Sequence, residues 1–418
     1  MNVAMISYHT CPLATLGGKD TGGMNVYVRD LSRFLGMYGV HVDVFTRSQD
    51  EHVPHVLHDL GCGNRVVHIP AGPESPRPKK ELQDYLPLFT REIIEFASRK
   101  SITYDLIHSH YWLSGIASIQ LKTSWNIPFI HMFHTLAKLK NQIAQNEKEI
   151  EGDFRINGEL ETIRMSDKII SATIDEQFQL INLYDCIKEK IDVIPPGVDV
   201  GKFYPIPSDE AKDYLNITHD ERMLLFVGRI EPLKGVDTLI KAIAQMQKSD
   251  VLSECPHYLY IIGGDADERK EDMDNEISRL RELSQQLGVG DLIIFSGKKN
   301  QDTLQYYYSA AEIVVMPSNY ESFGMVALEA MACGTPVIAT QVGGLQHLVK
   351  DQTTGFVIPH NDPDALEEKL TQLICQPSLR EKMSAQCVEY ARTYSWESIT
   401  PRIIQLYHAT IKEHTDKK

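Results

Sequence analysis

Arg229 and Lys234 are basic residues in a turn between an apolar segment and an amphipathic one. The preceding residues 224–227 have the length of a strand, and residues 236–247 have a helical period. The turn would therefore lie at a helix N-terminus, where backbone N–H groups and the helix dipole favour an anion. Two cations added there predict a diphosphate site. Outside this strand-turn-helix context, a solvated basic turn would be the better interpretation.

Glu321 and Glu329 lie on either side of a predicted loop-to-helix transition. An ionised carboxylate only accepts hydrogen bonds, which suits it to the paired hydroxyls of a sugar or a ribose. A glutamate in mid-helix is usually just a solvated helix former. Glu329, however, is followed by the small and apolar residues 330–334, where a charge is costly unless it is paired. A hydroxyl partner for Glu329 is therefore expected.

A glycine-rich segment, residues 17–23, opens the first predicted helix. Glycines at such a point allow the backbone to approach a ligand closely. The segment is not G-x-G-x-x-G, and G-x-x-x-x-G-K-[ST] does not occur in the chain. Nicotinamide-dinucleotide and P-loop sites therefore lack their fingerprints, and a dehydrogenase is the least favoured enzyme class.

Histidines follow two probable strands, in residues 108–112 and 131–135. Their His-x-His spacing is compatible with a metal site, but no carboxylate or third histidine lies nearby in the sequence. We therefore favour loop histidines satisfied by the backbone over metal ligands. A histidine that donates to a substrate oxygen at a strand end remains the alternative.

Basic residues also gather in residues 76–80, and Arg155 lies further along the chain. A local positive patch in an acidic protein suggests an anionic ligand. A solvated basic turn accounts equally well for the pattern by itself.

The elements that must position these residues repeat one pattern in two halves. Residues 3–8 form a predicted strand, a helix follows with Gly39 at its end, and residues 40–46 form a second strand. From about residue 223, apolar strands again alternate with helices, and each strand ends in a polar or glycine-rich loop. Two Rossmann-like, doubly wound parallel-sheet domains of α/β class are predicted, with a hinge at residues 194–197. Ligands bind at the carboxyl ends of strands in such sheets.

The composition and net charge of the chain argue against several classes of binding partner. The chain has 418 residues and a formal net charge of −15, which argues against a nucleic-acid partner and against docking on anionic lipid. No apolar stretch approaches the roughly 20 residues of a membrane span. The seven cysteines form no C-x-x-C pair, which favours reduced thiols over disulfides or zinc. A cytoplasmic protein without integral membrane association is expected.

Taken together, these motifs resemble the retaining, nucleotide-sugar-dependent glycosyltransferases of family 4, which have the GT-B fold. The resemblance covers nearly the whole chain and is most specific in residues 227–235 and 321–339. It implies two domains that face one cleft. The acceptor domain would comprise residues 1–196 with 400–418, including a final helix near 400–413, and the nucleotide-sugar domain would comprise residues 197–399.

The resemblance also implies roles in the donor site. Arg229 and Lys234 would hold the diphosphate and replace a divalent metal, so that no obligatory metal or other cofactor is expected. Glu329 would bind the ribose, Glu321 the sugar hydroxyls, and His134 would approach the donor sugar near the acceptor. The closest family members imply a UDP-sugar. Further donor contacts are implied for Gly23, Gly297, Phe323, Gly324 and Met325.

The first half is similar to the D-inositol-3-phosphate glycosyltransferases of this family, in residues 9–14, 20–28, 44–47, 110–115 and 134–141. The implied acceptor is a phosphorylated polyol or sugar. The implied acceptor contacts are Lys79, Tyr111, Thr135 and Arg155 at the phosphate, Asn25 at the polyol ring, and His9. Residues 76–82 are also similar to sucrose-phosphate synthases, whose acceptor is a hexose phosphate, although those enzymes have Gln in place of Met24.

The implied reaction is hexosyl transfer by front-face displacement, in which the leaving phosphate oxygen helps to deprotonate the acceptor hydroxyl. A nucleotide-sugar epimerase shares the fold but has no acceptor-phosphate site. A non-catalytic sugar-nucleotide-binding regulator would be expected to lose site side chains, and the whole set is present here. The oligomeric state does not follow from the sequence, and a homodimer is one possibility.

Overall fold

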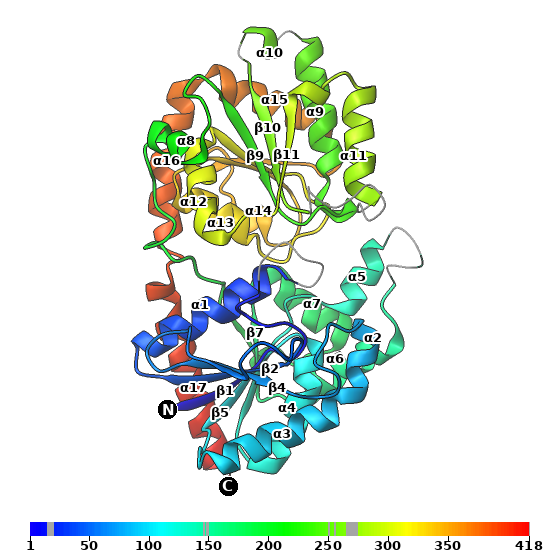
Figure 1. Cartoon of the computed structure of the whole chain (residues 1–418), viewed down its shortest axis with the longest axis vertical. Coiled ribbons are helices and arrows are strands. Elements are labelled where there is room, and N and C mark those ends of the chain that lie inside the picture. Colours follow the sequence, from blue (N-terminus) through cyan, green and yellow to red (C-terminus); the bar gives the residue numbers. More distant parts are fainter. Residues whose placement is uncertain are drawn as a thin grey trace. The chain divides into compact units, whose positions relative to one another are not determined.

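The computed structural model of the chain describes residues 1–14, 21–144, 147, 150–249, 251–254, 256–264 and 275–417. The chain divides into two compact units, each built around one β-sheet (Figure 1). The first unit contains Met1–Ala14, Gly23–Gly197 and Trp396–Lys418, and the second contains Val198–Ser395 with the described residues Thr21 and Gly22. The first unit is therefore discontinuous in sequence.

The sheet of the first unit has eight strands in the order β3-β4-β2-β1-β5-β6-β7-β8. The strands pair in parallel, apart from the antiparallel pair of β3 and β4. Its strands are β1 (Asn2–Ile6), β2 (His41–Arg47), β3 (Val56–Leu57), β4 (Arg65–Ile69), β5 (Leu106–His110), β6 (Phe129–Met132), β7 (Lys168–Ser171) and β8 (Ile191–Val193). Its helices are α1 (Gly23–Met37), α2 (Lys79–Leu82), α3 (Leu86–Arg99), α4 (Trp112–Trp125), α5 (Ala137–Ile143), α6 (Asp153–Met165), α7 (Ile174–Tyr184) and α17 (Trp396–Asp416).

The sheet of the second unit has six strands in the order β11-β10-β9-β12-β13-β14, all paired in parallel. Its strands are β9 (Met223–Val227), β10 (Tyr258–Ile262), β11 (Ile293–Gly297), β12 (Ile313–Met316), β13 (Val337–Thr340) and β14 (Gly355–Ile358). Its helices are α8 (Ser208–Leu215), α9 (Val236–Lys248), α10 (Val251–Glu254), α11 (Asn275–Gln286), α12 (Gln301–Ala310), α13 (Met325–Ala332), α14 (Leu345–Leu348), α15 (Pro363–Cys375) and α16 (Pro377–Arg392). The two parallel sheets confirm the predicted α/β class.

The first helix ends as the sequence predicts. Helix α1 ends at Met37, and Gly39 follows in the left-handed region with φ of +77°. The N–H of Gly39 donates to the carbonyl of Gly36 at 3.0 Å, and the N–H of Val40 donates to the carbonyl of Leu35 at 3.0 Å. This pair of bonds satisfies two carbonyls at the end of the helix and turns the chain into β2.

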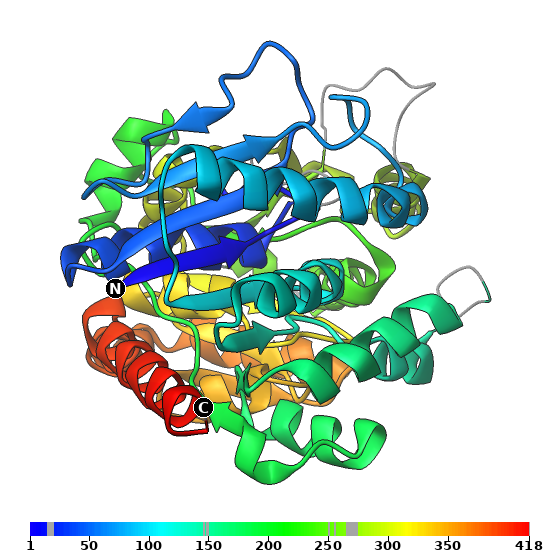
Figure 2. The same cartoon turned by 90° about the horizontal axis from the view of Figure 1, so that it is seen from below.

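The last helix is longer than the sequence predicts, since α17 begins at Trp396 and not near residue 400. The indole of Trp396 is fully buried in the first unit, which fixes the start of the helix there. Pro401 lies inside the helix and has no N–H to donate to the carbonyl of Glu397. The hydroxyl of Tyr38 donates to that carbonyl instead, at 3.2 Å. Helix α17 is drawn in red in Figures 1 and 2.

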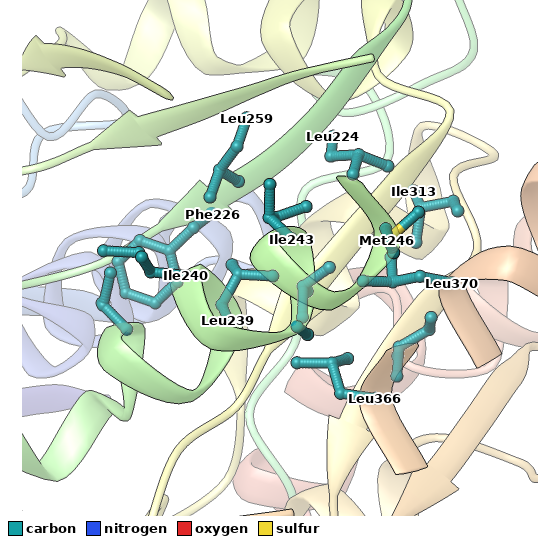
Figure 3. Close-up of a cluster of buried hydrophobic side chains, with 14 of the residues drawn as sticks. Leu224, Phe226, Leu239, Ile240, Ile243, Met246, Leu259, Ile313, Leu366 and Leu370 are labelled. Carbon is teal, nitrogen blue, oxygen red and sulfur yellow. The ribbon is translucent and has the colours of Figure 1, made fainter. Parts of the chain in front are cut away.

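The core of the second unit packs β9 against helices α9 and α15 (Figure 3). Leu224 and Phe226 are two residues apart on β9 and therefore face the same side of the sheet. Leu239 and Ile243 are four residues apart on α9 and share one helical face. All four side chains are at most 2% exposed. Each such side chain stabilises the fold by about 1.5–3 kcal/mol, so the core fixes the start of α9 beside the end of β9.

Candidate active site

Each sheet has a point where the connections leave a central strand in opposite directions. In the first unit, β1 lies between β2 and β5, and in the second unit β9 lies between β10 and β12. Ligands of doubly wound sheets bind outside the carboxyl ends of the strands at such points. His9 and Tyr111 follow β1 and β5, Arg229 and Lys234 follow β9, and Glu321 follows β12. These five predicted site residues therefore follow strands at the two topological switch points.

The two cations predicted to hold a diphosphate each pair with a carboxylate in the second unit. Lys234 Nζ donates to Glu321 Oε2 at 2.5 Å, and the two side chains are 17% and 18% exposed. Arg229 Nη1 donates to Glu231 Oε1 at 2.6 Å, and both of these side chains are more exposed. The predicted phosphate-binding and hydroxyl-binding residues, Lys234 and Glu321, thus contact each other directly. A ligand with a phosphate next to hydroxyls can satisfy both partners of this pair.

Three glycines hold the main chain around Glu321 and Lys234. A Cβ atom at Gly235, where φ is +63°, would lie 2.0 Å from the carbonyl oxygen of Pro317. A Cβ atom at Gly343 would lie 1.9 Å from the carbonyl oxygen of Glu321, and the N–H of Gly344 donates to that same oxygen at 3.1 Å. The turn at Gly343 and Gly344 was not among the predicted site residues. It follows β13, so the pattern of a strand followed by glycines was the signal that could have found it.

Glu329 is buried on α13 and has partners within the second unit. It is 4% exposed, and its Oε2 accepts a hydrogen bond from the hydroxyl of Tyr308 at 2.8 Å. Gln301 Nε2 donates to its Oε1 at 3.4 Å. Burial raises the pKa of Tyr308 well above its usual range, so the hydroxyl stays a donor. The expected hydroxyl partner is thus a tyrosine of α12, and burial by itself does not require a ligand at Glu329.

The remaining predicted donor contacts lie in both units. Gly324, with φ of +104°, precedes α13, and Phe323 before it is buried. Met325 is the first residue of α13, where no side chain caps the helix N-terminus. Gly297 ends β11, and its carbonyl accepts from the N–H of Gly263 at 3.0 Å. Gly23 begins α1 and therefore belongs to the first unit.

Tyr111 gathers three of the predicted acceptor residues in the first unit. The ring of His9 lies against it with centroids 4.4 Å apart, Lys79 Nζ lies 5.5 Å from its centroid, and Arg155 Cζ lies 5.1 Å from it. Tyr111 has φ of +73°, a strained conformation for a residue with a large side chain. Its N–H donates to the carbonyl of Met132 at 2.9 Å, which holds the turn between β5 and α4. Cations on an aromatic face concentrate positive charge at this switch point.

Arg155 is 4% exposed and fully engaged by neighbouring groups. Its Nη2 donates to Thr135 Oγ1 at 3.0 Å, its Nη1 to Glu151 Oε1 at 2.6 Å, and its Nε to Glu159 Oε1 at 2.8 Å. Lys140 Nζ also donates to Glu151 Oε1. Glu151, Glu159 and Lys140 were not predicted as site residues from the sequence. The four-residue spacing of Arg155 and Glu159 was the available signal, because such residues share one face of a helix, whereas Glu151 lies before α6 begins.

The prediction of loop histidines satisfied by the backbone is wrong for three of them. Strands β5 and β6 extend through His110 and Met132, so His108, His110 and His131 are strand residues, all 0% exposed. Their partners are side chains. His110 Nδ1 lies 3.0 Å from His134 Nε2, His108 Nδ1 lies 2.6 Å from the hydroxyl of Tyr407 on α17, and His131 Nδ1 lies 2.6 Å from the hydroxyl of Ser109.

His134 and Asn25 lie close to the loop that follows β1. His134 has φ of +62°, and its ring contacts the edge of Tyr27 with centroids 5.4 Å apart. Burial lowers the pKa of His134 to about 3, so its imidazole is neutral at neutral pH. Asn25 Nδ2 donates to Thr10 Oγ1 and to the carbonyl of Cys11, each at 2.7 Å. Helix α1 thereby fixes the loop after β1.

Further predictions from the sequence concern metal sites, membrane spans, the state of the cysteines and the glycine-rich segment 17–23. Within the part of the chain that the structure describes, no group of three His, Cys, Asp or Glu residues is placed to hold a metal ion. No helix among the described residues is long and apolar enough to cross a bilayer. The six described cysteines are free. Of the glycine-rich segment 17–23, residues 17–20 lie outside the described residues.

Comparison with known proteins places the chain in a family. The family model for glycosyl transferases group 1 matches residues 207–393, and the model for glycosyltransferase family 4 matches residues 21–202. A D-inositol 3-phosphate glycosyltransferase of Acidothermus cellulolyticus is 38% identical over 98% of this chain and 91% of its own length. One from Frankia alni is 38% identical over 96% of this chain and 97% of its own length. This chain belongs to glycosyltransferase family 4.

Solved structures agree with this family and its fold. A sucrose-phosphate synthase of Thermosynechococcus elongatus has a TM-score of 0.88 and 34% identity, with 99% of each chain covered. The Anabaena protein HepE, solved in complex with UDP-glucose, has a TM-score of 0.73 at 17% identity, with 98% of this chain and 100% of that chain covered. The family 4 chain is therefore a glycosyltransferase enzyme with the predicted GT-B fold.

Proposed function

We propose that this family 4 enzyme transfers a hexosyl group from a nucleoside-diphosphate sugar, with UDP as the nucleotide, to a phosphorylated polyol such as D-inositol 3-phosphate. One observation carries the proposal. His9, Lys79 and Arg155 gather at Tyr111, in a chain that is 38% identical over 98% of its length to a D-inositol 3-phosphate glycosyltransferase. A site with two cations close to one aromatic ring favours an acceptor that carries a phosphate.

The donor half of the proposal rests on the groups at the ends of β9 and β12. Arg229 and Lys234 would bind the diphosphate, and Glu321 would accept hydrogen bonds from sugar hydroxyls. Charge develops on the diphosphate as the bond to the anomeric carbon breaks, and fixed cations stabilise that charge. Lys234 pairs with Glu321 in the structure, so a bound diphosphate would share this cation with Glu321 or replace Glu321 as its partner.

Transfer would proceed on one face of the sugar, with retention of configuration. The bond from the anomeric carbon to the diphosphate oxygen breaks, and the acceptor oxygen bonds to the same face. The acceptor hydroxyl gives its proton to the leaving phosphate oxygen. The neutral imidazole of His134 would donate a hydrogen bond near the donor sugar and carry no charge. In this proposal no metal takes part, and chelation with EDTA leaves turnover unchanged.

The test is a panel of nucleotide sugars crossed with inositol phosphate, hexose phosphates and the unphosphorylated form of each acceptor. Nucleotide release and product mass report transfer, and the anomeric coupling constant of the product reports retention. We expect turnover with phosphorylated acceptors only. Equal turnover of unphosphorylated acceptors would contradict the proposed binding of the acceptor phosphate by Lys79 and Arg155. Product formed without any acceptor would indicate an epimerase.

A second candidate is transfer to a hexose phosphate, as in a sucrose-phosphate synthase. The 34% identity and TM-score of 0.88 over 99% of both chains favour it. The same cations would bind the phosphate of either acceptor, so the two candidates differ only at the polyol or sugar ring. The hexose-phosphate arm of the panel decides between them.

A further inference from the structure

Glu151 is a carboxylate placed among the cations of the first unit. Its Oε1 accepts from Arg155 Nη1 at 2.6 Å and also from Lys140 Nζ. Lys79, Lys140 and Arg155 all lower the pKa of Glu151 against the effect of its burial. Lys79 and Arg155 are also the two cations that lie against the ring of Tyr111. One carboxylate oxygen thus occupies a position that an oxygen of a bound phosphate would suit.

The second carboxylate on Arg155, Glu159, has a different environment. Its side chain is 0% exposed, and it accepts from the N–H of Ala137 at 3.0 Å and from the hydroxyl of Tyr184. Releasing Glu159 would leave a buried backbone donor and a buried hydroxyl without their acceptor, which is costly. Glu159 therefore acts as a fixed counter-charge that orients Arg155.

Glu151 can leave its position without a rearrangement of the backbone. Its N–H donates to Asn141 Oδ1 at 2.7 Å, and Asn141 Nδ2 donates to its carbonyl at 3.0 Å, so the main chain is held independently of the side chain. The side chain is 26% exposed. A change of rotamer would transfer the carboxylate into solvent, where it is hydrated, and free Arg155 and Lys140 for another anion.

We propose that the Glu151 carboxylate occupies the anion site of the free enzyme as an internal competitor, and that Lys140 is a third cation of that site with Lys79 and Arg155. This inference rests on the proposed function, which assigns an acceptor phosphate to the same site. When a monoanionic ligand displaces the Glu151 carboxylate, one negative charge beside the cations is replaced by an equal one, so little binding free energy is gained. A phosphate monoester carries a charge of about −1.5 to −2 at pH 7 and gains from the exchange. Glu151 therefore selects phosphorylated acceptors against acceptors that carry a carboxylate.

The test measures the binding of inorganic phosphate and of acetate to the full chain by calorimetry, without any sugar. In Glu151→Gln the competitor charge is lost while the side-chain shape is kept. We expect phosphate to bind about fivefold more tightly than to the wild-type chain, and acetate binding to become measurable, as one partly exposed ion pair is removed. Lys140→Gln is expected to weaken phosphate binding. Glu161→Gln is the control, because Glu161 lies on α6, ten residues after Glu151, and the ion pair that it forms is with the exposed Arg164 at 3.7 Å.

Unchanged or weaker phosphate binding in Glu151→Gln would overturn the inference and leave Glu151 as a residue that orients Arg155. If Glu151→Gln does not fold, Glu151→Asp withdraws the carboxylate by one methylene, and an affinity for phosphate above that of the wild type is then expected. The inference and the proposed function fail separately. Tighter phosphate binding with no turnover of any phosphorylated acceptor refutes only the proposed function. Turnover of phosphorylated acceptors without tighter binding in Glu151→Gln refutes only the inference.

Discussion

At the residue scale, the charged groups of both candidate sites are paired with groups of the protein itself. Lys234 pairs with Glu321, Arg155 with Glu151 and Glu159, and Glu329 accepts from Tyr308. A buried charge that loses its partner destabilises the fold by several kcal/mol. Substitutions at these positions therefore affect stability and ligand binding together, and each test needs a measurement of both.

Replacing the two predicted diphosphate ligands tests the donor site. In Arg229→Ala or Lys234→Ala we expect kcat to fall about 100-fold, because one fixed cation no longer stabilises the leaving diphosphate. Steady-state kinetics give the change, and circular dichroism checks that the fold survives. Lys241→Ala is the control, since Lys241 pairs with Asp237 at 3.0 Å on the exposed face of α9. Near-normal turnover of both site variants would contradict the role.

The hydroxyl of Tyr308 is expected to stabilise the second unit through Glu329. Tyr308→Phe removes a donor from a carboxylate that is 4% exposed. The free energy of unfolding should fall by about 1–3 kcal/mol in urea denaturation. Tyr306→Phe on the same helix is the matched control, because the ring of Tyr306 stacks on Tyr214 at 3.7 Å and Phe keeps that contact. Equal stability of the two variants would show that Glu329 does not depend on this hydroxyl.

At the scale of elements, the loops that carry the site residues are held in place by close main-chain contacts with neighbouring loops and strands. In the second unit, the loop after β9 contacts the loop after β12 at Gly235, and the N–H of Asn319 donates to the carbonyl of Leu233 at 2.8 Å. In the first unit, the strained turn at Tyr111 bonds to the end of β6. Rigid loops of this kind keep catalytic groups in position, so small changes in a loop should reduce activity.

The substitution Gly235→Ala, which adds one methyl group, tests whether the contact between these two loops is needed for activity. Gly235→Ala would place its Cβ 2.0 Å from the carbonyl oxygen of Pro317, in a backbone conformation with φ of +63°. The two loops must separate, so we expect kcat/KM to fall by at least about tenfold together with a lower melting temperature. Gly288→Ala is the control, because Gly288 has φ of +75° but no atom within 4 Å of its Cβ position. Equal loss in both variants would show that backbone strain, and not the contact between the loops, is responsible.

At the scale of the whole molecule, the first unit buries an unusual number of neutral histidines. Burial lowers the pKa of His108 and His134 to about 3. Burial also lowers the pKa values of three more histidines well below their usual range: His9, His110 and His131. From about one pH unit above the ordinary histidine pKa of 6.5, these imidazoles are neutral in both the folded and the unfolded chain, so they do not affect the pH dependence of stability there.

Acidification should therefore destabilise the protein. Below about pH 6.5 the unfolded chain binds protons that the folded chain does not, and each buried histidine lowers the free energy of unfolding by up to about 1.4 kcal/mol per pH unit. Glu176 acts in the opposite direction, because burial raises its pKa to about 7 and the folded chain binds its proton first. Burial also raises the pKa values of Glu159 and Asp192. Five histidines outweigh these three carboxylates, so the melting temperature should fall from pH 7 to pH 5.

The control for this pH dependence is a pair of histidine substitutions. His131→Asn removes one buried imidazole and should reduce the slope of stability against pH. His408→Asn removes an exposed imidazole on α17 and should leave the slope unchanged. A melting temperature that is constant between pH 7 and pH 5 would contradict the burial of neutral histidines.

The two doubly wound sheets and the types of residue at their strand ends could be predicted from the amino-acid sequence. Apolar strands of four or five residues, each followed by a glycine-rich or polar loop, form local patterns that can be recognised without knowledge of the tertiary contacts. The carboxyl ends of parallel strands meet at one edge, so Arg229 and Glu321 could be assigned to such an edge without coordinates. The end of α1 at Gly39 was predictable for the same local reason.

The contacts among these residues could be found only from the three-dimensional packing. Lys234 and Glu321 are 87 residues apart, and His108 and Tyr407 are 299 apart. Such contacts depend on the order and register of strands, which the local period of a sequence does not specify. The early start of α17 likewise follows from the burial of Trp396 in the first unit. The sequence therefore supplied the chemical groups and their strand ends, and the packing of the sheets supplied their partners.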